Sequence, residues 1–358
     1  MRINNVRAAA VMEGVVRADR NTKRLLRHIR RGEIALICHD DLDEPAAEGL
    51  LRSGVKAVIN SGRTMTSAFP HDGPLLLLRE GIPIYEIDES SFELLQDGER
   101  IRIRDGTLTG LHAELVCYPF GYEEWERLKR TGERMYPLTL LGFAENTLHY
   151  AANELNSLTR PLTLPELNNP LETRDVLVVS RGSGCREDLA ALRHYIRSAK
   201  PVLVGVDGGA DVLVSQGYVP DLIIGDMDSV SDQTLRVGAQ LLVHAYPDGW
   251  APGLERIRQL GLASDTVAAP GTSEDLALRL SYEQGAARIV IVGSHSEPID
   301  FLKKGRAGMA STLLVRMLVG HKLIDAKGAS LWGSKKSQLH KFAAIVEGGA
   351  LWRTSPYR

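Results

Sequence analysis

The side chains best suited to chemistry in this sequence are three aspartates in two loops. Asp207-Gly208-Gly209 follows the apolar run 202–206, and Gly225-Asp226-Met227-Asp228-Ser229 follows the apolar run 222–224. In open parallel sheets, ligands bind beyond the carboxyl ends of the strands, so the spacing predicts that these carboxylates face one crevice. The glycines beside them let the backbone approach a ligand closely.

The chemistry that these carboxylates predict is the binding of Mg²⁺. Asp207, Asp226 and Asp228 are the predicted metal ligands, because Mg²⁺ takes oxygen ligands and bridges one or two carboxylates to substrate phosphates. ATP or another nucleotide is the matching ligand or co-substrate, with the metal neutralising charge during phosphoryl transfer. Asp-Gly and Asp-x-Asp-Ser are also good turn and helix-capping sequences, so a purely structural role stays open.

Two further loops supply candidate phosphate-binding residues. Arg181 and Gly182 follow the run 176–180, at the end of another expected strand. Lys304 and Arg306 precede a helix expected to start near Ala307, where a positive helix N-terminus favours phosphate. A plain strand-to-helix loop in the first case, and a solvated basic turn in the second, are the alternatives.

The elements that position these loops follow from the hydrophobic pattern. Strands expected at 176–180, 202–206, 222–224, 241–244 and 288–292 alternate with helical segments. Continuous apolar strands separated by helices predict a doubly wound parallel sheet with right-handed crossovers. The fold class is therefore α/β.

The remainder of the chain predicts a second α/β unit. Its expected strands are 34–38, 55–60 and 82–87, its helices 45–52 and 75–80, and a β-hairpin closes it over 100–116. Helical periodicity follows from residue 122 to about 156. The predicted organisation is an N-terminal α/β domain 1–118, a helical connector 119–172, a nucleotide-binding domain 173–330 and a tail 331–358.

Composition narrows the class of protein. At 358 residues the chain exceeds one usual core, and 43 Lys plus Arg against 45 Asp plus Glu argue against a nucleic-acid partner. Three separated cysteines indicate a reducing compartment. The sequence shows neither a signal peptide nor an apolar run of transmembrane length, so we expect a cytoplasmic protein.

The two aspartate loops, taken together, resemble the catalytic core of thiamin pyrophosphokinases. The resemblance implies that the aspartates hold Mg²⁺ and ATP while a pyrophosphoryl group moves to a hydroxyl, that Asp275 assists as a further aspartate, and that the chain forms a homodimer. Those kinases carry an Arg- and Asp-His-containing motif after the strand that corresponds to 288–292. At that place this chain reads Gly293-Ser294-His295. The acceptor is therefore left open. The phosphate-binding residues assigned to this core are Gly208, Gly209, Gly225, Ser229, Thr272 and Ser273.

Nearly the whole chain is similar to the SteA family of cytokinetic ring proteins. This resemblance implies a role at the division septum, with recruitment from the cytoplasm by a membrane-bound partner. The strings that carry it are His39-Asp40-Asp41-Leu42-Asp43, Ala46-Ala47-Glu48, Val58-Ile59-Asn60, Gly81-Ile82-Pro83, 225–232, 244–249, 271–275, 304–312 and 325–328.

Two functional hypotheses follow from the sequence. The first is a Mg-dependent enzyme that transfers a phosphoryl or pyrophosphoryl group to an unidentified hydroxyl. The second is a catalytically inactive scaffold at the septum that binds a nucleotide or another diphosphate compound.

Overall fold

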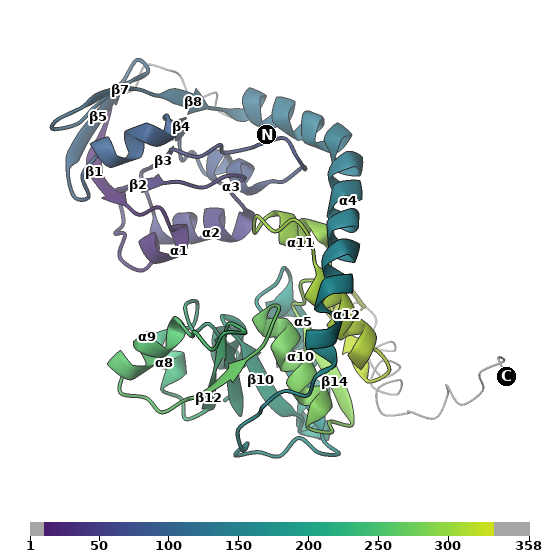
Figure 1. Cartoon of the computed structure of the whole chain (residues 1–358). Helices are drawn as coiled ribbons and strands as arrows, with labels where there is room; N and C mark the ends of the chain where they lie inside the picture. The colour runs from purple at the N-terminus through teal and green to yellow at the C-terminus, as the bar shows by residue number, and fades with distance from the viewer. Residues whose placement is uncertain (1–10, 333–358) are drawn as a thin grey trace. The chain divides into compact units, whose positions relative to one another are not determined.

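The computed structural model describes residues 11–332, which form two compact α/β units (Figure 1). The first unit contains residues 11–144 together with Pro298–Ala307, and the second contains Glu145–Glu297 and 308–332. Each unit is built on its own sheet, as the expected α/β class requires. Most of the predicted tail 331–358 lies outside the described residues.

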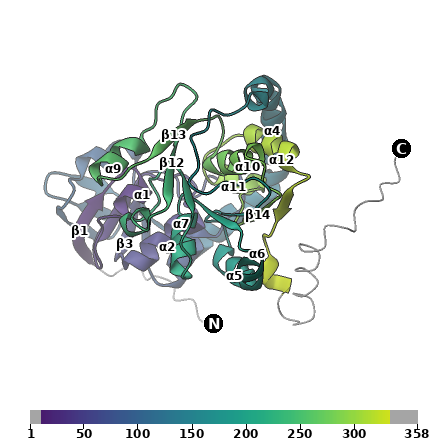
Figure 2. The same cartoon turned by 90° about the horizontal axis from the view of Figure 1, so that it is seen from below.

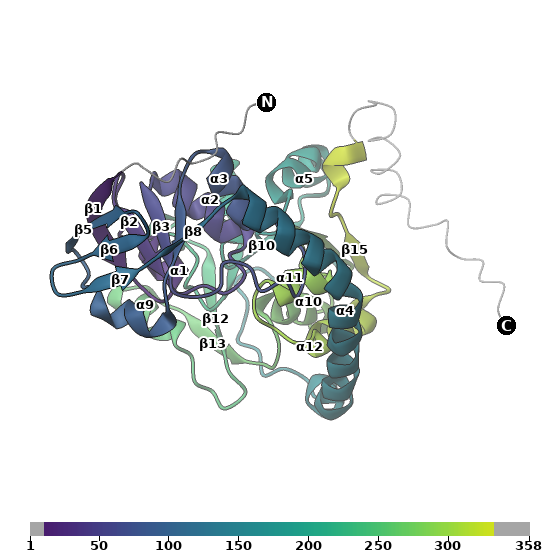
Figure 3. The ribbon, with the colours of Figure 1, turned by 90° about the horizontal axis from the view of Figure 1, so that it is seen from above.

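The first unit has a mixed eight-stranded sheet in the order β7-β6-β5-β1-β2-β3-β4-β8. Figure 3 labels most of these strands. Strands β1 to β4 are parallel, whereas β5, β6, β7 and β8 pair antiparallel with their neighbours. The expected hairpin over 100–116 is therefore a three-stranded meander. The strands are β1 Met12–Ala18, β2 Ile34–Ile37, β3 Ala57–Asn60, β4 Ile84–Glu86, β5 Arg100–Arg104, β6 Thr107–Thr109, β7 Glu114–Val116 and β8 Tyr118–Phe120.

Helices cover one face of this sheet. The sequence defines both ends of one of them, α2 Glu44–Ser53. Helix α2 starts where the Asp43 side chain accepts from the Ala46 amide, with a proline in the first turn, and it ends at left-handed Gly54. Its apolar side packs on β2 and β3, which are buried throughout. The helical segments of the unit are α1 Thr22–Leu25, α2 Glu44–Ser53, α3 Gly73–Arg79, η1 Glu89–Leu94 and α11 Pro298–Leu302.

A single long helix, α4 Tyr122–Thr159, leaves the first unit and continues into the second. Pro137 lies inside it, where the missing N–H and the ring disfavour a straight helix, and the helix bends along its length in Figure 1. Within residues 11–332, no helix is both long enough and apolar enough to cross a membrane.

The second unit has a seven-stranded, wholly parallel sheet in the order β13-β12-β11-β10-β9-β14-β15. Its strands are β9 Asp175–Val179, β10 Val202–Val206, β11 Leu222–Gly225, β12 Gln240–Ala245, β13 Asp265–Ala268, β14 Arg288–Val292 and β15 Leu323–Asp325. Its helical segments are α5 Cys185–Ala191, α6 Arg193–Ala199, α7 Gly209–Ser215, α8 Asp232–Leu235, α9 Gly253–Gln259, α10 Ser273–Glu283, α12 Ala310–Val319 and η2 Ala329–Trp332.

Both faces of this sheet are covered, which confirms the doubly wound fold. Val176 and Val178 pack with α10 and α12 on one face, while Leu177 and Val179 pack with α5, α6 and α7 on the other (Figure 2). Burial on both faces explains why these strands read as continuous apolar runs.

The strand order reverses at β9. From β9 the chain proceeds outward through β10, β11, β12 and β13, and then returns to place β14 and β15 on the other side of β9. The loops that follow β9 and β14 therefore leave in opposite directions. Such a switch point opens a crevice at the carboxyl ends of the strands.

Two glycines on α4 allow a test of packing in the first unit. A Cβ at Gly132 would lie 2.8 Å from the backbone carbonyl of Phe69, whereas a Cβ at Gly142 would meet no atom within 4 Å. We expect Gly132→Ala to lower the free energy of unfolding by about 1–3 kcal/mol through overpacking. Gly142→Ala should raise it by about 0.5–1 kcal/mol through helix propensity. Urea unfolding followed by circular dichroism measures both, and equal effects of the two variants would contradict this packing.

Candidate functional site

The centre of the site is a pair of carboxyl groups at the ends of two neighbouring strands. Asp207 follows β10 in a left-handed conformation, with φ of 46°, and its amide donates to Ile224 O of β11 at 2.9 Å. Its carboxyl group is hydrogen-bonded to that of Asp226, which follows β11. Burial first, and the neighbouring Asp226 second, raise the pKa of Asp207 to about 7. The Asp207 carboxyl group is therefore partly protonated near neutral pH.

One oxygen of this pair lacks any hydrogen-bond partner within the described part of the chain. Asp207 Oδ1 is buried and unpaired, although a buried polar atom normally has a partner. A Cβ at Gly225 would lie 1.8 Å from that oxygen, so only glycine permits the close approach. The site combines a surplus of negative charge with an unused oxygen.

Glycines also bring the loop after β9 against the acidic loops. A Cβ at Gly208 would lie 2.4 Å from Arg181 Cζ, which places the Arg181 guanidinium directly over the Gly208 backbone. A Cβ at Gly209 would lie 1.9 Å from Val179 O. The Gly208 amide donates to Ser229 Oγ at 3.1 Å. The structure thus gathers Arg181, Gly208, Gly209, Gly225 and Ser229 around Asp207 and Asp226.

The second acidic loop is held from beneath by residues that the sequence did not reveal. Met227 is fully buried with φ of 61°, so it fixes the loop between the exposed Asp226 and Asp228. Arg256 of α9 donates to Met227 O, to Val230 O at 2.8 Å, and to the Asp232 carboxylate. The Asp228 amide donates to Asp226 Oδ1 at 2.9 Å. No motif marks Arg256, because its partners, two backbone carbonyls and the Asp232 carboxylate, lie more than twenty residues away in the sequence.

The family model described as thiamin pyrophosphokinase, catalytic domain, matches residues 192–248. The second unit contains a thiamin pyrophosphokinase-like domain. The match covers both acidic loops but less than half of the chain. No curated protein sequence matches the chain.

Two solved structures have weaker similarity. Thiamine pyrophosphokinase from Bacillus subtilis is 20% identical with a TM-score of 0.26, and the match covers 43% of this chain and 59% of the kinase. The chain therefore spans about three fifths of that kinase. A 3-isopropylmalate dehydratase from Methanocaldococcus jannaschii is 11% identical with a TM-score of 0.23, over 40% of this chain and 99% of that protein. At these TM-scores the structural likenesses carry no argument.

Helix α10 brings one more predicted residue to the pyrophosphokinase-like site. Ser273, its first residue, is hydrogen-bonded to the Asp207 carboxyl group, which lowers the pKa of Asp207 against the larger raising effects of burial and Asp226. The Ser273 hydroxyl also lies 3.3 Å from His244 Nδ1, and His244 Nε2 lies 3.0 Å from Ala269 O. This fixes α10 at the carboxyl edge of the sheet.

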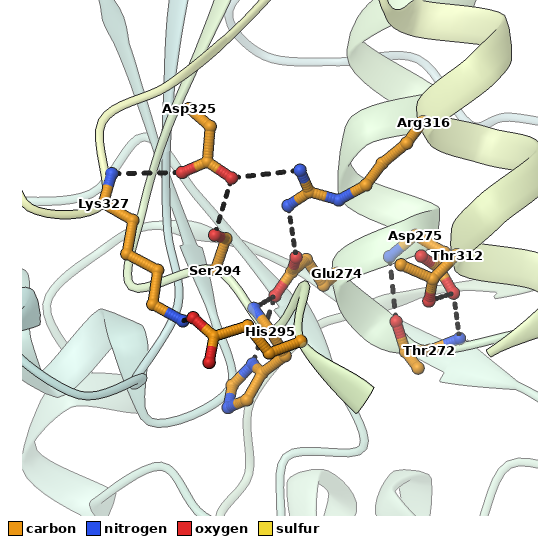
Figure 4. Close-up of polar contacts among 10 residues, drawn as sticks. Thr272, Glu274, Asp275, Ser294, His295, Thr312, Arg316, Asp325 and Lys327 are labelled. Atoms are coloured by element: carbon orange, nitrogen blue, oxygen red, sulfur yellow. Dashed lines mark hydrogen bonds and ion pairs between the residues drawn. The ribbon is translucent and has the colours of Figure 1, made fainter. Parts of the chain in front are cut away.

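Asp275 and Thr272 cap the start of α10 (Figure 4). Asp275 Oδ2 accepts from the Thr272 amide at 2.9 Å, from Ser311 Oγ at 2.9 Å and from Thr312 Oγ1 at 3.0 Å. Burial raises the pKa of the Asp275 carboxyl group. These contacts account for Asp275 and Thr272 as residues that join α10 to α12, while the predicted part of Asp275 in transfer stays a prediction.

Lys304 and Arg306 belong to the first unit rather than to the pyrophosphokinase-like unit. The helix expected to start near Ala307 is α12, which begins at Ala310, and α11 ends before it at Leu302. Lys304 therefore follows a helix C-terminus, where left-handed Gly305 closes the last turn. Neighbouring Lys303 pairs with Glu44 at 2.7 Å. The predicted phosphate contacts of Lys304 and Arg306 stay predictions.

The carboxyl pair suits Mg²⁺ held jointly with phosphates. Residues 11–332 contain no group of three or more His, Cys, Asp or Glu side chains arranged for a metal ion. Of the three predicted ligands, Asp207 and Asp226 contact each other through their carboxyl groups. Asp228 is linked to Asp226 through its backbone amide. Two carboxylates with an unused oxygen match the usual Mg²⁺ site, in which phosphates and water complete the coordination.

The pair makes stability depend on pH in a defined direction. Below an unfolded pKa of roughly 3.9 both states are protonated, and between roughly pH 4 and 7 only the folded Asp207 keeps its proton. Stability should therefore fall as pH rises through this window. We expect Asp207→Asn to be more stable than wild type by about 2–4 kcal/mol at pH 8 and nearly equal at pH 4.

Calorimetric melting at several pH values checks the Asp207 effect. Glu255→Gln, on the exposed face of α9, is the matched control and should follow wild type at every pH. Parallel curves for Asp207→Asn and wild type would show that the pair carries no strain.

Proposed function

We propose that the second unit binds Mg²⁺ together with ATP or another nucleotide or diphosphate compound, and transfers a pyrophosphoryl or phosphoryl group to a hydroxyl. The observation that carries this proposal is the contacting Asp207–Asp226 pair with its unpaired Oδ1. It lies within the segment that matches the thiamin pyrophosphokinase catalytic domain. The pair supplies negative charge that is stabilised by a divalent cation.

The residues around the pair have separate parts in this function. Asp207 and Asp226 hold the metal, with Asp228 contributing through the same loop. Arg181 offers a planar fork of donors suited to phosphate oxygens, and the glycine backbone at 208–209 lets phosphate lie close to it. Bound Mg²⁺ would neutralise the negative charge that builds up on the phosphates during transfer.

A nucleotide-binding scaffold at the division septum is the second candidate. It is supported by the extent of the family match, which stops at residue 248 and leaves the strand-end loops after β13 and β14 unmatched. The strings that resemble the SteA family occur in both units, and this resemblance is the ground for proposing a division role. In this form the protein is a homodimer recruited by a membrane-bound partner.

Binding and turnover separate the two candidates. Isothermal titration of the purified chain with ATP and Mg²⁺ should give a Mg-dependent association that Asp207→Asn and Asp226→Asn each weaken at least about tenfold, since each removes a charged ligand worth over 1.4 kcal/mol. Incubation with a panel of hydroxyl metabolites should release AMP, or ADP if a single phosphoryl group moves. Chromatography of the nucleotides measures both products.

Glu255→Gln serves as the control for these assays and should bind and turn over ATP as wild type does. Binding without AMP or ADP from any acceptor would select the scaffold. An absence of binding to ATP, to pyrophosphate and to nucleoside diphosphates, with Asp226→Asn indistinguishable from wild type, would contradict both candidates.

The division role makes a prediction of its own. A fluorescent fusion expressed at native level in a dividing bacterium that encodes this chain should concentrate at the septum. Asp226→Asn in the same fusion should leave this localisation intact if the nucleotide site and the recruiting surface are separate. Uniform fluorescence of the wild-type fusion throughout the division cycle would exclude the septal role.

A further inference from the structure

A second polar cluster, distinct from the carboxyl pair, lies at the carboxyl ends of the strands beside the switch point. The loops after β9 and β14 touch there, because a Cβ at Gly182 would lie 2.4 Å from Gly293 O, and Gly293 itself has φ of 67°. The β9 loop carries Arg181 over Gly208. The β14 loop continues into Ser294 and His295, so His295 lies at the same strand edge as the proposed phosphate site.

Glu274 of α10 determines how His295 is held. Its carboxylate is almost fully buried, and Oε2 lies 3.1 Å from the His295 amide and 3.2 Å from the ring Nδ1 (Figure 4). A carboxylate only accepts hydrogen bonds, so we assign the ring proton to Nδ1. Nε2 then carries the lone pair, and no partner for it exists within the described residues. The His295 side chain keeps 25% of its surface exposed.

The charges that face this pair come from α12, β15 and the loops beside them. Arg316 bridges Glu274 at 3.5 Å and Asp325 at 3.0 Å, and Ser294 Oγ donates to Asp325 at 2.8 Å. Lys327 pairs with Glu297 at 2.8 Å and its amide donates to Asp325 at 3.0 Å. Arg316 therefore compensates the buried Glu274 and leaves its second oxygen to His295 (Figure 4).

We propose that the Glu274–His295 pair is the proton acceptor for the hydroxyl that receives the transferred group. This inference rests on the proposed pyrophosphoryl or phosphoryl transfer and adds the residue that activates the acceptor. A buried carboxylate that orients a partly exposed imidazole through Nδ1 and leaves Nε2 as the acceptor is the arrangement of a general base. In the sequence, His295 stands out only as a departure from the kinase motif.

The place of His295 along the sheet edge fits this role. β14 and β10 are separated only by β9, so at the usual strand spacing the two loops lie roughly 10 Å apart. A metal ion, a phosphoryl group and an attacking hydroxyl in line occupy a length of this order. The acceptor would then lie over β9 and β14, and the phosphates over β9, β10 and β11.

The step balances without any further reactant. The acceptor hydroxyl gives its proton to His295 Nε2 while its oxygen forms a bond to the β-phosphorus of ATP. The bond between that phosphorus and the bridging α,β-oxygen breaks, and AMP leaves with the oxygen and its electron pair. His295 then releases the proton to solvent. For single phosphoryl transfer, the same proton movement accompanies attack on the γ-phosphorus and loss of ADP.

The test uses His295→Gln, Glu274→Gln and the control His321→Gln in the full chain. His321 is an exposed histidine after α12, outside the cluster. Each variant is titrated with Mg²⁺ and ATP, and AMP or ADP release is measured from pH 5 to 9 with the panel of hydroxyl compounds and with water alone. His295→Gln should bind Mg²⁺–ATP within about twofold of wild type, yet turn over about 10²–10⁴ times more slowly. Its rate should lose the acid limb of the wild-type pH profile.

Chemical rescue separates proton transfer from a merely structural contact. Free imidazole should restore part of the activity of His295→Ala, and should have no such effect on Glu274→Gln, which retains the histidine. His321→Gln should match wild type throughout. If Glu274→Gln fails to fold, the partly exposed position 295 still allows the measurement.

The outcomes distinguish this inference from the proposed function. Wild-type turnover with unchanged rate and pH profile in His295→Gln would overturn the inference and leave the transfer function intact. Binding of Mg²⁺–ATP without turnover would overturn the inference and select the scaffold. Absence of Mg²⁺–ATP binding by wild type would overturn the proposed function itself, and the inference with it.

Discussion

The contact between the Asp207 and Asp226 carboxyl groups is the interaction on which the site depends. Burial disfavours the ionised form of Asp207, and the neighbouring Asp226 carboxyl group adds repulsion, so the pKa of Asp207 rises to about 7. A fold that keeps such a pair forgoes stability that asparagine would restore. A bound cation reverses the balance, since it compensates both charges at once. The strain is thus stored where a positively charged ligand can release it.

Glycine makes this contact geometrically possible. At Gly225, Gly209 and Gly182 an added Cβ would come within 2.4 Å of an oxygen on an adjacent loop or strand. The carboxyl ends of β9, β10, β11 and β14 can therefore crowd together, while the helices on both faces bury the strands that hold them. Because glycine has no side chain at these positions, an arginine, carboxyl groups and backbone amides lie close together at this edge of the sheet.

The sequence predicted those parts whose signal is local. Buried central strands such as β10 and β11 appear as apolar runs, and the aspartates directly after them were placed correctly at one edge. The sequence did not predict β13 or β1. β13 buries only Val267, so its residues form no apolar run, and β1 is only partly buried along its length. The helix expected to start near Ala307 begins only at Ala310, after left-handed Gly305 and after Gly308. Arg256 and Glu274 act through contacts distant in sequence, which no spacing could indicate.

In the proposed transfer reaction, the two polar clusters at the strand edge would have different parts. Asp207 and Asp226 concentrate negative charge, which suits a metal ion and, through that ion, phosphates. Removal of a proton from an acceptor hydroxyl beside them needs a separate group that takes the proton. The Glu274–His295 pair lies on the far side of β9, with Arg316 absorbing the charge of Glu274. A ligand that only bound at the acidic pair would need no imidazole with an open Nε2 there. The separation of charge along the edge therefore favours transfer over passive binding as the reason for both clusters.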